Sequence, residues 1–326
     1  MSQPPQIDVA HNLVSRNKRH QDMEVSYLLK CYEMGSRDFA GVDLRGADLS
    51  GATLININLE GANLTGANLS RAFLTKANLN GAFLNWANLS FTKLSESCLV
   101  DADLTKANLN GAFLVKADLA KAKLSAANLS NANLRNTNLQ RSNLCGTTLQ
   151  GVNLRNANLK GANLNWANLK GARLSGAVVQ GAFLNGVNLA GAFLNGVELR
   201  GVDLSGVNLS EAKLSGADLQ EANLSTANFT EAKLRGVNLI GADLTGANLN
   251  RAYLGRAELD WSNLSQADLS EADLSDASVL GVKIEGTEFS GVTLPEMTRR
   301  YLCLVASGHT AWSQKKTQET LNCEKG

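Results

Sequence analysis

The stretch GANLTGANLS, residues 61–70, decides the fold of this chain, and GADLTGANLN, residues 241–250, repeats it almost unchanged. One apolar residue stands at the centre of every five, and these centres run without insertion or deletion from Phe39 to Leu294. That span holds 52 units, and leucine is the central residue in 46 of them. The residue two before the centre is usually small, and the residue directly before it is usually Asn or Asp.

A period of five fits neither an α-helix nor a β-strand, whose side-chain periods are about 3.6 and 2 residues. On a helix the central residues would wander around the axis, and many of the 29 glycines would weaken it. A chain that bends once per unit instead directs the central and small residues inward and the others outward. Gly and Asn at the bends tolerate a positive φ, and successive coils pair their backbone groups. The sequence therefore predicts an all-β solenoid.

The tandem A(N/D)LxG motif of residues 61–70 and 241–250 resembles the pentapeptide-repeat family. The resemblance covers about 256 of the 326 residues. It implies a right-handed quadrilateral β-helix with four units per coil, which makes about 13 coils. The long uninterrupted tract and the RDF sequence at its start, residues 37–39, are similar to members abundant in cyanobacteria. Some of those are implicated in developmental regulation through protein contacts.

Three regions are expected along the chain. Residues 1–36 form an N-terminal tail and capping helix, residues 37–295 the β-helix, and residues 296–326 a C-terminal capping helix and mobile tail. Apolar spacing predicts the first helix over residues 22–34, and Pro295 is suited to open the second. Helices at both ends would cover the apolar cross-section and the unpaired edges of the solenoid. The alternative is that a terminal helix joins two chains into a homodimer, and resemblance to gyrase-targeting members favours the C-terminal one.

Large outward aromatic residues are the candidate partner-binding residues, because rings on a rigid surface can anchor a protein partner. They stand directly before a centre or at a bend. With 20 residues per coil, residues separated by a multiple of 20 stack on successive coils, and we call such a stack a column; several of the aromatic residues share one. They are Phe73, Phe83, Trp86, Phe113, Trp166, Phe183, Phe193 and Tyr253. The alternative is that these rings are scattered surface residues or cover neighbouring methylene groups.

The charged residues are unevenly distributed. The chain has 31 basic and 30 acidic residues, and the net charge of +1 argues against direct nucleic-acid binding by the whole chain. However, residues 104–197 carry a net charge of +9 and residues 198–288 one of −8. The basic segment could meet an acidic partner, the acidic segment could imitate nucleic acid, or the two could associate head to tail. The plain alternative is that surface charge keeps a long β-structure soluble.

Catalytic and metal-binding motifs are missing from the sequence. HExxH, GxSxG, Walker A and a GxGxxG after a strand are all absent, so we expect no enzyme, no catalytic residues, no cofactor and no metal. No segment approaches the roughly 20 apolar residues of a membrane helix, and we see no signal peptide. The five scattered cysteines form no CxxC pair, which fits reduced thiols and a cytoplasmic location.

The leading hypothesis is a non-catalytic, regulatory scaffold that offers rigid outward faces to a protein partner of unknown identity. The alternative, by resemblance to the quinolone-resistance branch of the family, is a DNA mimic that modulates DNA gyrase or a topoisomerase. Residues 37–295 hold 22 basic and 23 acidic residues. That balance opposes mimicry, because the DNA-binding groove of such an enzyme is positive.

Overall fold

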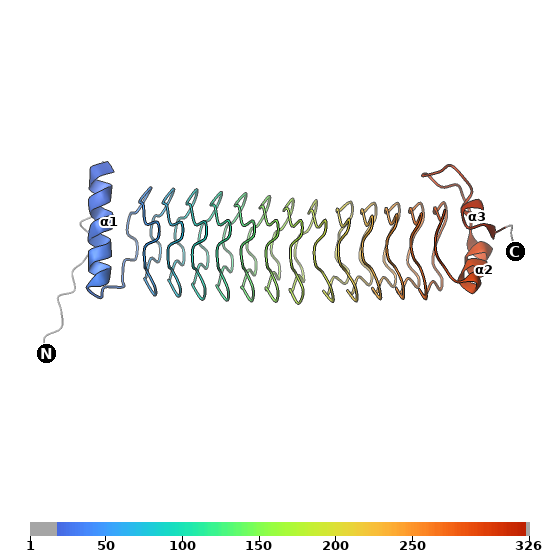
Figure 1. The fold of residues 1–326 in the computed structure, drawn as a ribbon, viewed down its shortest axis with the longest axis horizontal. Coiled ribbons are helices and arrows are strands. Elements are labelled where there is room, and N and C mark those ends of the chain that lie inside the picture. The colour runs from blue at the N-terminus through green and yellow to red at the C-terminus, as the bar shows by residue number, and fades with distance from the viewer. Residues whose placement is uncertain (1–17, 324–326) are drawn as a thin grey trace. The chain divides into compact units, whose positions relative to one another are not determined.

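The computed structural model describes residues 18–323, with side chains described from residue 25 onward. The chain divides into two compact units, Met1–Thr148 and Leu149–Gly326. The division falls inside residues 37–295, which the sequence predicted to form a single β-helix. In each unit the chain runs in stacked coils (Figure 1). The helices are α1, Lys18–Glu33, in unit 1, and α2, Glu296–Val305, and α3, Thr317–Thr320, in unit 2. The predicted tail before residue 18 lies outside the described residues.

Parallel bridges one residue long hold neighbouring coils together, and each joins a residue to the one 20 positions later. In unit 1, for example, Asp43 is bridged to Asn63 and Asn63 to Phe83. The Leu44 N–H donates to the Asn63 carbonyl at 2.7 Å, and the Asn63 N–H donates to the Val42 carbonyl at 2.9 Å. Four five-residue units therefore make one coil. The fold is a β-helix type of solenoid, in which each coil satisfies the backbone of the next.

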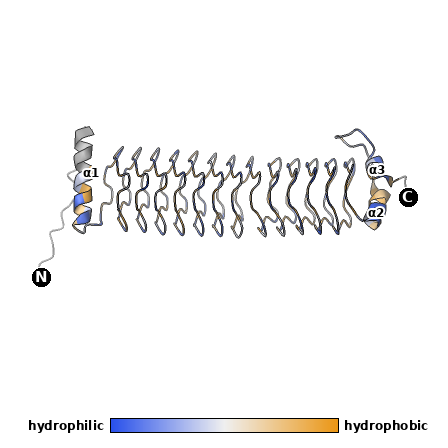
Figure 2. Ribbon diagram, in the orientation of Figure 1, coloured by the Kyte–Doolittle hydropathy of each residue, from blue (hydrophilic) through white to orange (hydrophobic). Residues whose placement is uncertain are grey.

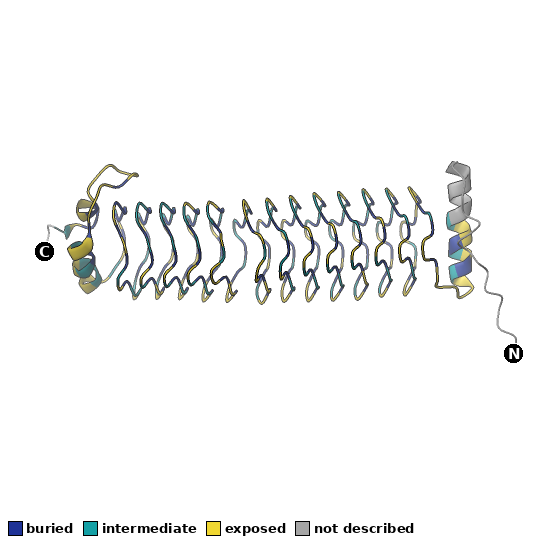
Figure 3. Cartoon of the chain, turned by 180° about the vertical axis from the view of Figure 1, so that it is seen from behind, coloured by how far each residue is buried: buried dark blue, intermediate teal, exposed yellow. Residues whose placement is uncertain are grey.

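The interior of each unit is filled by the central residues and by the small residues two before them. In unit 1, Ala62 and Leu64 have no exposed surface, and the same holds for Leu154 in unit 2. Hydrophilic and hydrophobic residues both recur on every coil (Figure 2), and the exposed positions gather at the bends (Figure 3). This burial confirms the predicted assignment of inward and outward positions.

Each bend is a β-turn, closed for example by a bond of 3.1 Å from the Ala47 N–H to the Leu44 carbonyl. The third residue of the turn has a positive φ, as Gly46 does at 66°. Bulky residues also take this position, since Trp86 has a φ of 61° and Phe91 one of 59°. Such residues rarely adopt this conformation. The prediction of Gly and Asn at the bends was therefore too narrow, because pairing with the adjacent coils imposes the turn on whichever residue stands there.

A ladder of asparagine side chains runs along one side of unit 1. The Asn88 amide donates to Asn68 Oδ1 at 3.2 Å, and the Asn108 amide donates to Asn88 Oδ1 at 3.3 Å. Asn68 Oδ1 also accepts the N–H of Ser70, at 3.2 Å, and so supports the following turn. Asparagine side chains stack in the same way in cross-β assemblies. The side chains on this side are occupied with their own neighbours.

Helix α1 lies beside the first coil of unit 1 (Figure 1). Its residues Leu28 and Cys31 are buried. The Tyr32 hydroxyl donates to the Ile55 carbonyl at 2.9 Å, and the Arg37 guanidinium lies 3.9 Å from the centre of the Tyr32 ring. Apolar burial and these contacts together fix the helix against the coil.

The C-terminal segment folds back on unit 2, although the sequence predicted a mobile tail after the C-terminal capping helix. The Gly286 N–H donates to the Ser307 carbonyl at 2.8 Å, and His309 and Lys316 form an antiparallel bridge. After this hairpin comes α3, whose Thr320 Oγ1 accepts the N–H of Phe289 at 3.2 Å. The prediction of mobility is wrong for residues 313–323, because this polar segment finds backbone partners on the last coil.

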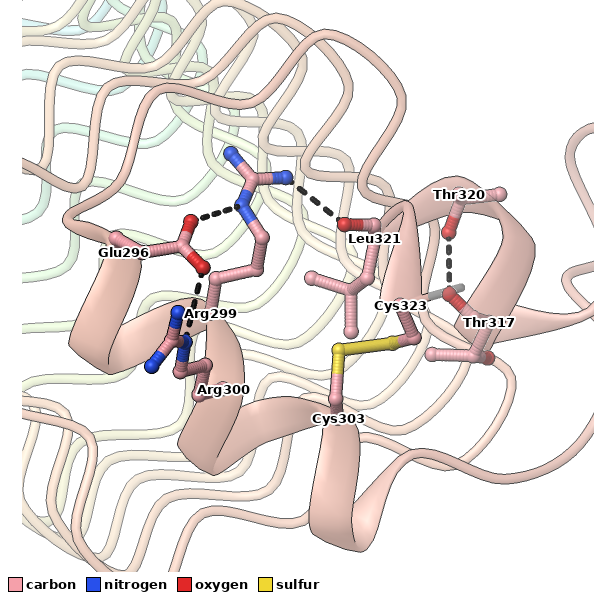
Figure 4. Close-up of a disulfide and its surroundings, with 8 residues drawn as sticks. All are labelled: Glu296, Arg299, Arg300, Cys303, Thr317, Thr320, Leu321 and Cys323. Atoms are coloured by element: carbon pink, nitrogen blue, oxygen red, sulfur yellow. Dashed lines mark hydrogen bonds and ion pairs between the residues drawn. A yellow bond between two sulfur atoms is a disulfide. The ribbon is translucent and has the colours of Figure 1, made fainter. Parts of the chain in front are cut away.

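A disulfide between Cys303 and Cys323 joins α2 to the residues that follow α3, with the two Cα atoms 5.6 Å apart (Figure 4). The expectation of reduced thiols is therefore wrong for this pair, whereas Cys31, Cys98 and Cys145 are free. The two half-cystines lie 20 positions apart in sequence and come together only because the tail returns to α2. Spacing alone contained no signal of this contact.

Candidate interaction surfaces

Seven of the eight aromatic residues predicted as partner-binding are exposed, and the eighth, Phe193, is half-buried. The exposed ones are Phe73, Phe83, Trp86 and Phe113 in unit 1, and Trp166, Phe183 and Tyr253 in unit 2. They therefore form separate groups, which differ in the charges that surround the rings.

The first group stands on one bridged column of unit 1. Bridges connect Thr53, Phe73, Lys93, Phe113 and Asn133 in that order, which confirms that Phe73 and Phe113 share a column. The Lys93 ammonium lies 3.2 Å from the centre of the Phe113 ring. A cation above a ring face is attracted by the quadrupole of the ring. The column therefore alternates rings with a cation that contacts one of them.

A second group in unit 1 surrounds Trp86, whose ring centre lies 4.3 Å from the Lys106 ammonium. Nearby, Phe83 is bridged to Asp103 and Asp103 to Lys123. Burial opposes ionisation of Asp103, but hydrogen bonds from neighbouring side chains and the charge of Lys123 outweigh it, so the pKa of Asp103 is lowered. The carboxylate of Asp103 stays ionised between the ring and the cation, so this group has mixed charge.

The predicted set left out two exposed rings of the coils, Phe91 and Trp261, which stand at bends as Trp86 and Trp166 do. The Phe91 ring lies across the backbone of Gly111, where an added Cβ would be 2.5 Å from the ring. The Trp261 ring covers Gly281 of the next coil in the same way. A large residue at a bend with glycine 20 positions later is the signal that would have found them. Glycine is required there because any side chain would displace the ring.

In unit 2 the ring of Phe193 lies between two cations. The Lys213 ammonium is 3.7 Å from the ring centre, and the Arg173 guanidinium is 6.0 Å from it. These side chains cover part of the ring and account for its half-buried state. Phe193 is thus less available to a partner than the sequence suggested, although it does share its column with Tyr253 through the Lys213 and Lys233 bridges.

The coil contacts of unit 2 open locally around Phe183. Over the residues that the structure describes, no bridge joins Phe183 to Asp203 or Val178 to Glu198, whereas the bridge between Asn188 and Asn208 is present. Phe183 and Val178 are both exposed, at 57% and 48%. The opening places two apolar side chains beside backbone groups that the neighbouring coil does not bond.

The outer side of α2 carries two apolar side chains that nothing in the described part of unit 2 covers. Met297 is 75% exposed and Leu304 is 84% exposed, while Leu302 on the inner side is buried. Figure 4 shows the charged side of the helix, where Glu296 lies within 3.5 Å of Arg299 and 3.1 Å of Arg300. The apolar side is therefore a further candidate contact surface.

Glu288 is the most deeply buried carboxylate among the described residues, and the C-terminal hairpin provides two of its partners. Its oxygens accept the Ser290 N–H at 3.0 Å, the Thr310 hydroxyl at 3.0 Å, and the Ser313 hydroxyl. Burial opposes ionisation, but these bonds outweigh it and hold the pKa of Glu288 below its usual value. Its role is structural, since the ionised group fastens the hairpin to the last coil.

None of the described helices is sufficiently long and apolar to cross a membrane.

The family profile described as pentapeptide repeats (8 copies) matches this chain in successive segments that run from residues 43–81 to residues 252–291. No curated protein matches the chain. The profile match extends over most of the chain and coincides with the coils of both units.

Several solved structures are similar to the chain. HetL, a pentapeptide repeat protein involved in heterocyst differentiation regulation in the cyanobacterium Nostoc sp. strain PCC 7120, is 30% identical, with 80% of this chain and 95% of HetL covered and a TM-score of 0.25. A pentapeptide repeat protein of the Arabidopsis thaliana thylakoid lumen is 37% identical over 40% of this chain and 90% of its own, with a TM-score of 0.23. QnrB1, a plasmid-mediated fluoroquinolone resistance protein, is 14% identical over 81% of this chain and 97% of its own, with a TM-score of 0.19.

Proposed function

The chain belongs to the pentapeptide-repeat family, and from that premise we propose that it is a non-catalytic, regulatory scaffold to which another protein binds. The observation that carries the proposal is the set of exposed rings on hydrogen-bonded coils, such as Phe73 and Phe113 in unit 1. A partner that covers such rings loses little entropy of ordering, because the backbone beneath them is already fixed. The 30% identity to HetL, a protein involved in heterocyst differentiation regulation, supports the regulatory part.

The test is capture of proteins from the source cells by the immobilised full chain. The variant Phe73→Ser with Phe113→Ser removes both rings of one column, and Thr53→Ser with Asn133→Ser alters the same column without touching a ring. We expect the first variant to lose partners that the wild type and the second variant retain. Capture of the same proteins by all three chains would show that this column is not the docking surface.

The second candidate function is that of a DNA mimic that modulates DNA gyrase or a topoisomerase. The acidic segment 198–288, with a net charge of −8, favours it, and the basic segment 104–197, with +9, opposes it. QnrB1, at 14% identity and a TM-score of 0.19, adds no support for it. A gyrase supercoiling assay separates the candidates. The scaffold proposal expects no effect of the full chain, and inhibition or protection of the enzyme would favour mimicry.

A homodimer through α2 is part of the proposal, because Met297 and Leu304 leave an apolar surface exposed. Light scattering on the full chain should give the mass of a dimer, and the variant Met297→Glu with Leu304→Glu should give that of a monomer. The matched control is Met34→Glu, which changes another exposed methionine in unit 1. A monomeric wild type would exclude this contact.

We infer the compartment from the disulfide between Cys303 and Cys323. A disulfide persists in oxidising compartments and is rare in the cytoplasm, so the pair argues against the cytoplasmic location expected from the sequence. Alkylation of intact cells before lysis tests the point. In an oxidising compartment the reagent should modify neither Cys303 nor Cys323. Modification of both thiols would support the cytoplasmic location expected from the sequence.

A further inference from the structure

One side of unit 1 carries exposed rings and cations on the same few coils. We name it the basic aromatic face, and it consists of five stretches related by 20 residues. They are residues 51–56, 71–76, 91–96, 111–116 and 131–136. The bridges from Thr53 through Phe73, Lys93 and Phe113 to Asn133 place these stretches one above another.

The basic aromatic face has a net charge of +4, because it holds five cations and a single acid, Glu96. Glu96 is already occupied by Lys76, whose ammonium lies 3.8 Å away. The side chains of Arg71, Lys116 and Arg135 are exposed and take part in no ion pair within the described range. The face therefore presents positive charge that its own coils leave without a counter-charge.

The rings of the face are held in place by the stack. Phe73, Phe91 and Phe113 are 44%, 46% and 38% exposed. The Phe91 ring rests on the backbone of Gly111, so its other side is turned to solvent. The Phe113 ring is contacted by the Lys93 ammonium at 3.2 Å. Rings and cations that are already ordered lower the entropic cost of binding a partner.

We propose that the basic aromatic face binds an acidic segment of a partner protein in which carboxylates alternate with aliphatic side chains. This inference rests on the proposed scaffold function and specifies the chemical class of its partner. Carboxylates of the segment meet Lys93, Lys116 and Arg135, while its aliphatic side chains pack on the rings of Phe73 and Phe91. Rings at the centre of a protein interface contribute most of its affinity, and complementary charge speeds association and excludes wrong partners.

A single-stranded nucleic acid also seeks cations and rings, but this face suits it less well. Bases stack on open ring faces, and the Lys93 ammonium occupies one face of the Phe113 ring. Ile55, 43% exposed, and half-buried Val115 add aliphatic surface, which packs on aliphatic side chains better than on bases. The surface chemistry therefore favours a protein segment, and nucleic-acid binding becomes an outcome that the test must separate.

The experiment measures the affinity of the full chain for labelled probes by fluorescence anisotropy. The probes are a synthetic peptide of alternating glutamate and leucine, its lysine–leucine counterpart, and oligothymidylate. The charge variant is Lys93→Glu, Lys116→Glu and Arg135→Glu. Its matched control, Arg155→Glu, Lys160→Glu and Lys170→Glu, makes the same charge change at exposed residues of unit 2. The ring variant is Phe73→Ser with Phe91→Ser, and circular dichroism checks that each variant folds.

The wild type should bind the glutamate–leucine peptide more tightly than the lysine–leucine peptide, and more weakly as salt rises. The charge variant should lose about tenfold or more in affinity, and the matched control about threefold or less. The ring variant should also bind more weakly. Equal losses in the charge variant and its control would overturn the inference, as would no binding of the acidic peptide or tighter binding of oligothymidylate.

Failure here is distinguishable from failure of the scaffold proposal. If the ring variant loses its cellular partners while the charge variant retains them, unit 1 is a docking surface for a partner that is not acidic. If the ring variant and the charge variant both retain every cellular partner, the basic aromatic face is not the docking surface of the scaffold either.

Discussion

Replacing Gly186 with alanine should destabilise unit 2 more than the same change at Gly181. The two glycines occupy successive bends with φ values of 64° and 67°, so alanine meets the same left-handed backbone at each, at a cost of about 1–2 kcal/mol. They differ in what the added methyl group would contact. At Gly181 nothing lies within 4 Å, whereas at Gly186 the methyl group collides with the ring of Trp166.

The additional cost at Gly186 follows from the surface that the Trp166 ring shares with the backbone. The residue is 70% exposed, so the ring has less than a third of its surface to lose. A fully buried tryptophan covers about 150–250 Å², and a third of that at about 25 cal/mol per Å² gives about 1–2 kcal/mol. We therefore expect Gly181→Ala to lower the free energy of unfolding by about 1–2 kcal/mol and Gly186→Ala by about 2–4 kcal/mol.

Urea denaturation of the full chain, followed by circular dichroism, measures both variants. The same pair is then made in a Trp166→Gly background, because glycine tolerates the positive φ of that bend and has no side chain that could contact residue 186. Without the ring, the two alanine substitutions should cost the same. Equal costs in the presence of Trp166 would refute the reasoning, and so would an excess cost at Gly186 that persists after the ring is removed.

Three further predictions concern the core and the C-terminal hairpin. Leu154→Asp places a carboxylate in the fully buried interior and should lower the free energy of unfolding by several kcal/mol. Asn153→Asp, on the outside of the coil, should leave the stability nearly unchanged. Equal melting temperatures of the two variants would contradict the burial pattern. Because the pKa of Glu288 is lowered, its ionised form stabilises the fold above its usual value of 4.5, and that contribution is lost as pH falls through the folded pKa. The free energy of unfolding of the wild type should therefore exceed that of the Glu288→Gln variant by about 1–3 kcal/mol at neutral pH, and the two values should converge in acid. A pH-independent difference in thermal unfolding would count against this. The Cys303–Cys323 disulfide closes a loop of about 20 residues, so its reduction should lower the free energy of unfolding by about 3 kcal/mol. The measurement is the denaturation midpoint, which should fall on reduction. A Cys303→Ser variant should show the same lower midpoint without reductant. An unchanged midpoint in both would mean that the cross-link does not stabilise the fold.

Much of the fold and part of the candidate site could be predicted from residue spacing. The five-residue period placed Leu154 inside and Asn153 outside, because an unbroken register admits one assignment of inward and outward positions. The column shared by Phe73 and Phe113 followed from four units per coil, which the resemblance to the pentapeptide-repeat family implied. The exposure of Phe193 did not, because it depends on how far the side chains of Arg173 and Lys213 reach over the ring.

The sequence alone therefore determined the solenoid and its inward leucines, since these depend only on a repeated local bend, while the columns of outward residues needed the four units per coil that the family resemblance implied. Tertiary structure alone decided the C-terminal region, where Glu288 gains hydroxyl partners and Cys303 meets Cys323. It also decided which rings rest on glycines, as Trp166 does on Gly186. The physical reason is that a repeat specifies the contacts between successive coils, whereas a segment outside the repeat takes its conformation from the particular surface on which it folds.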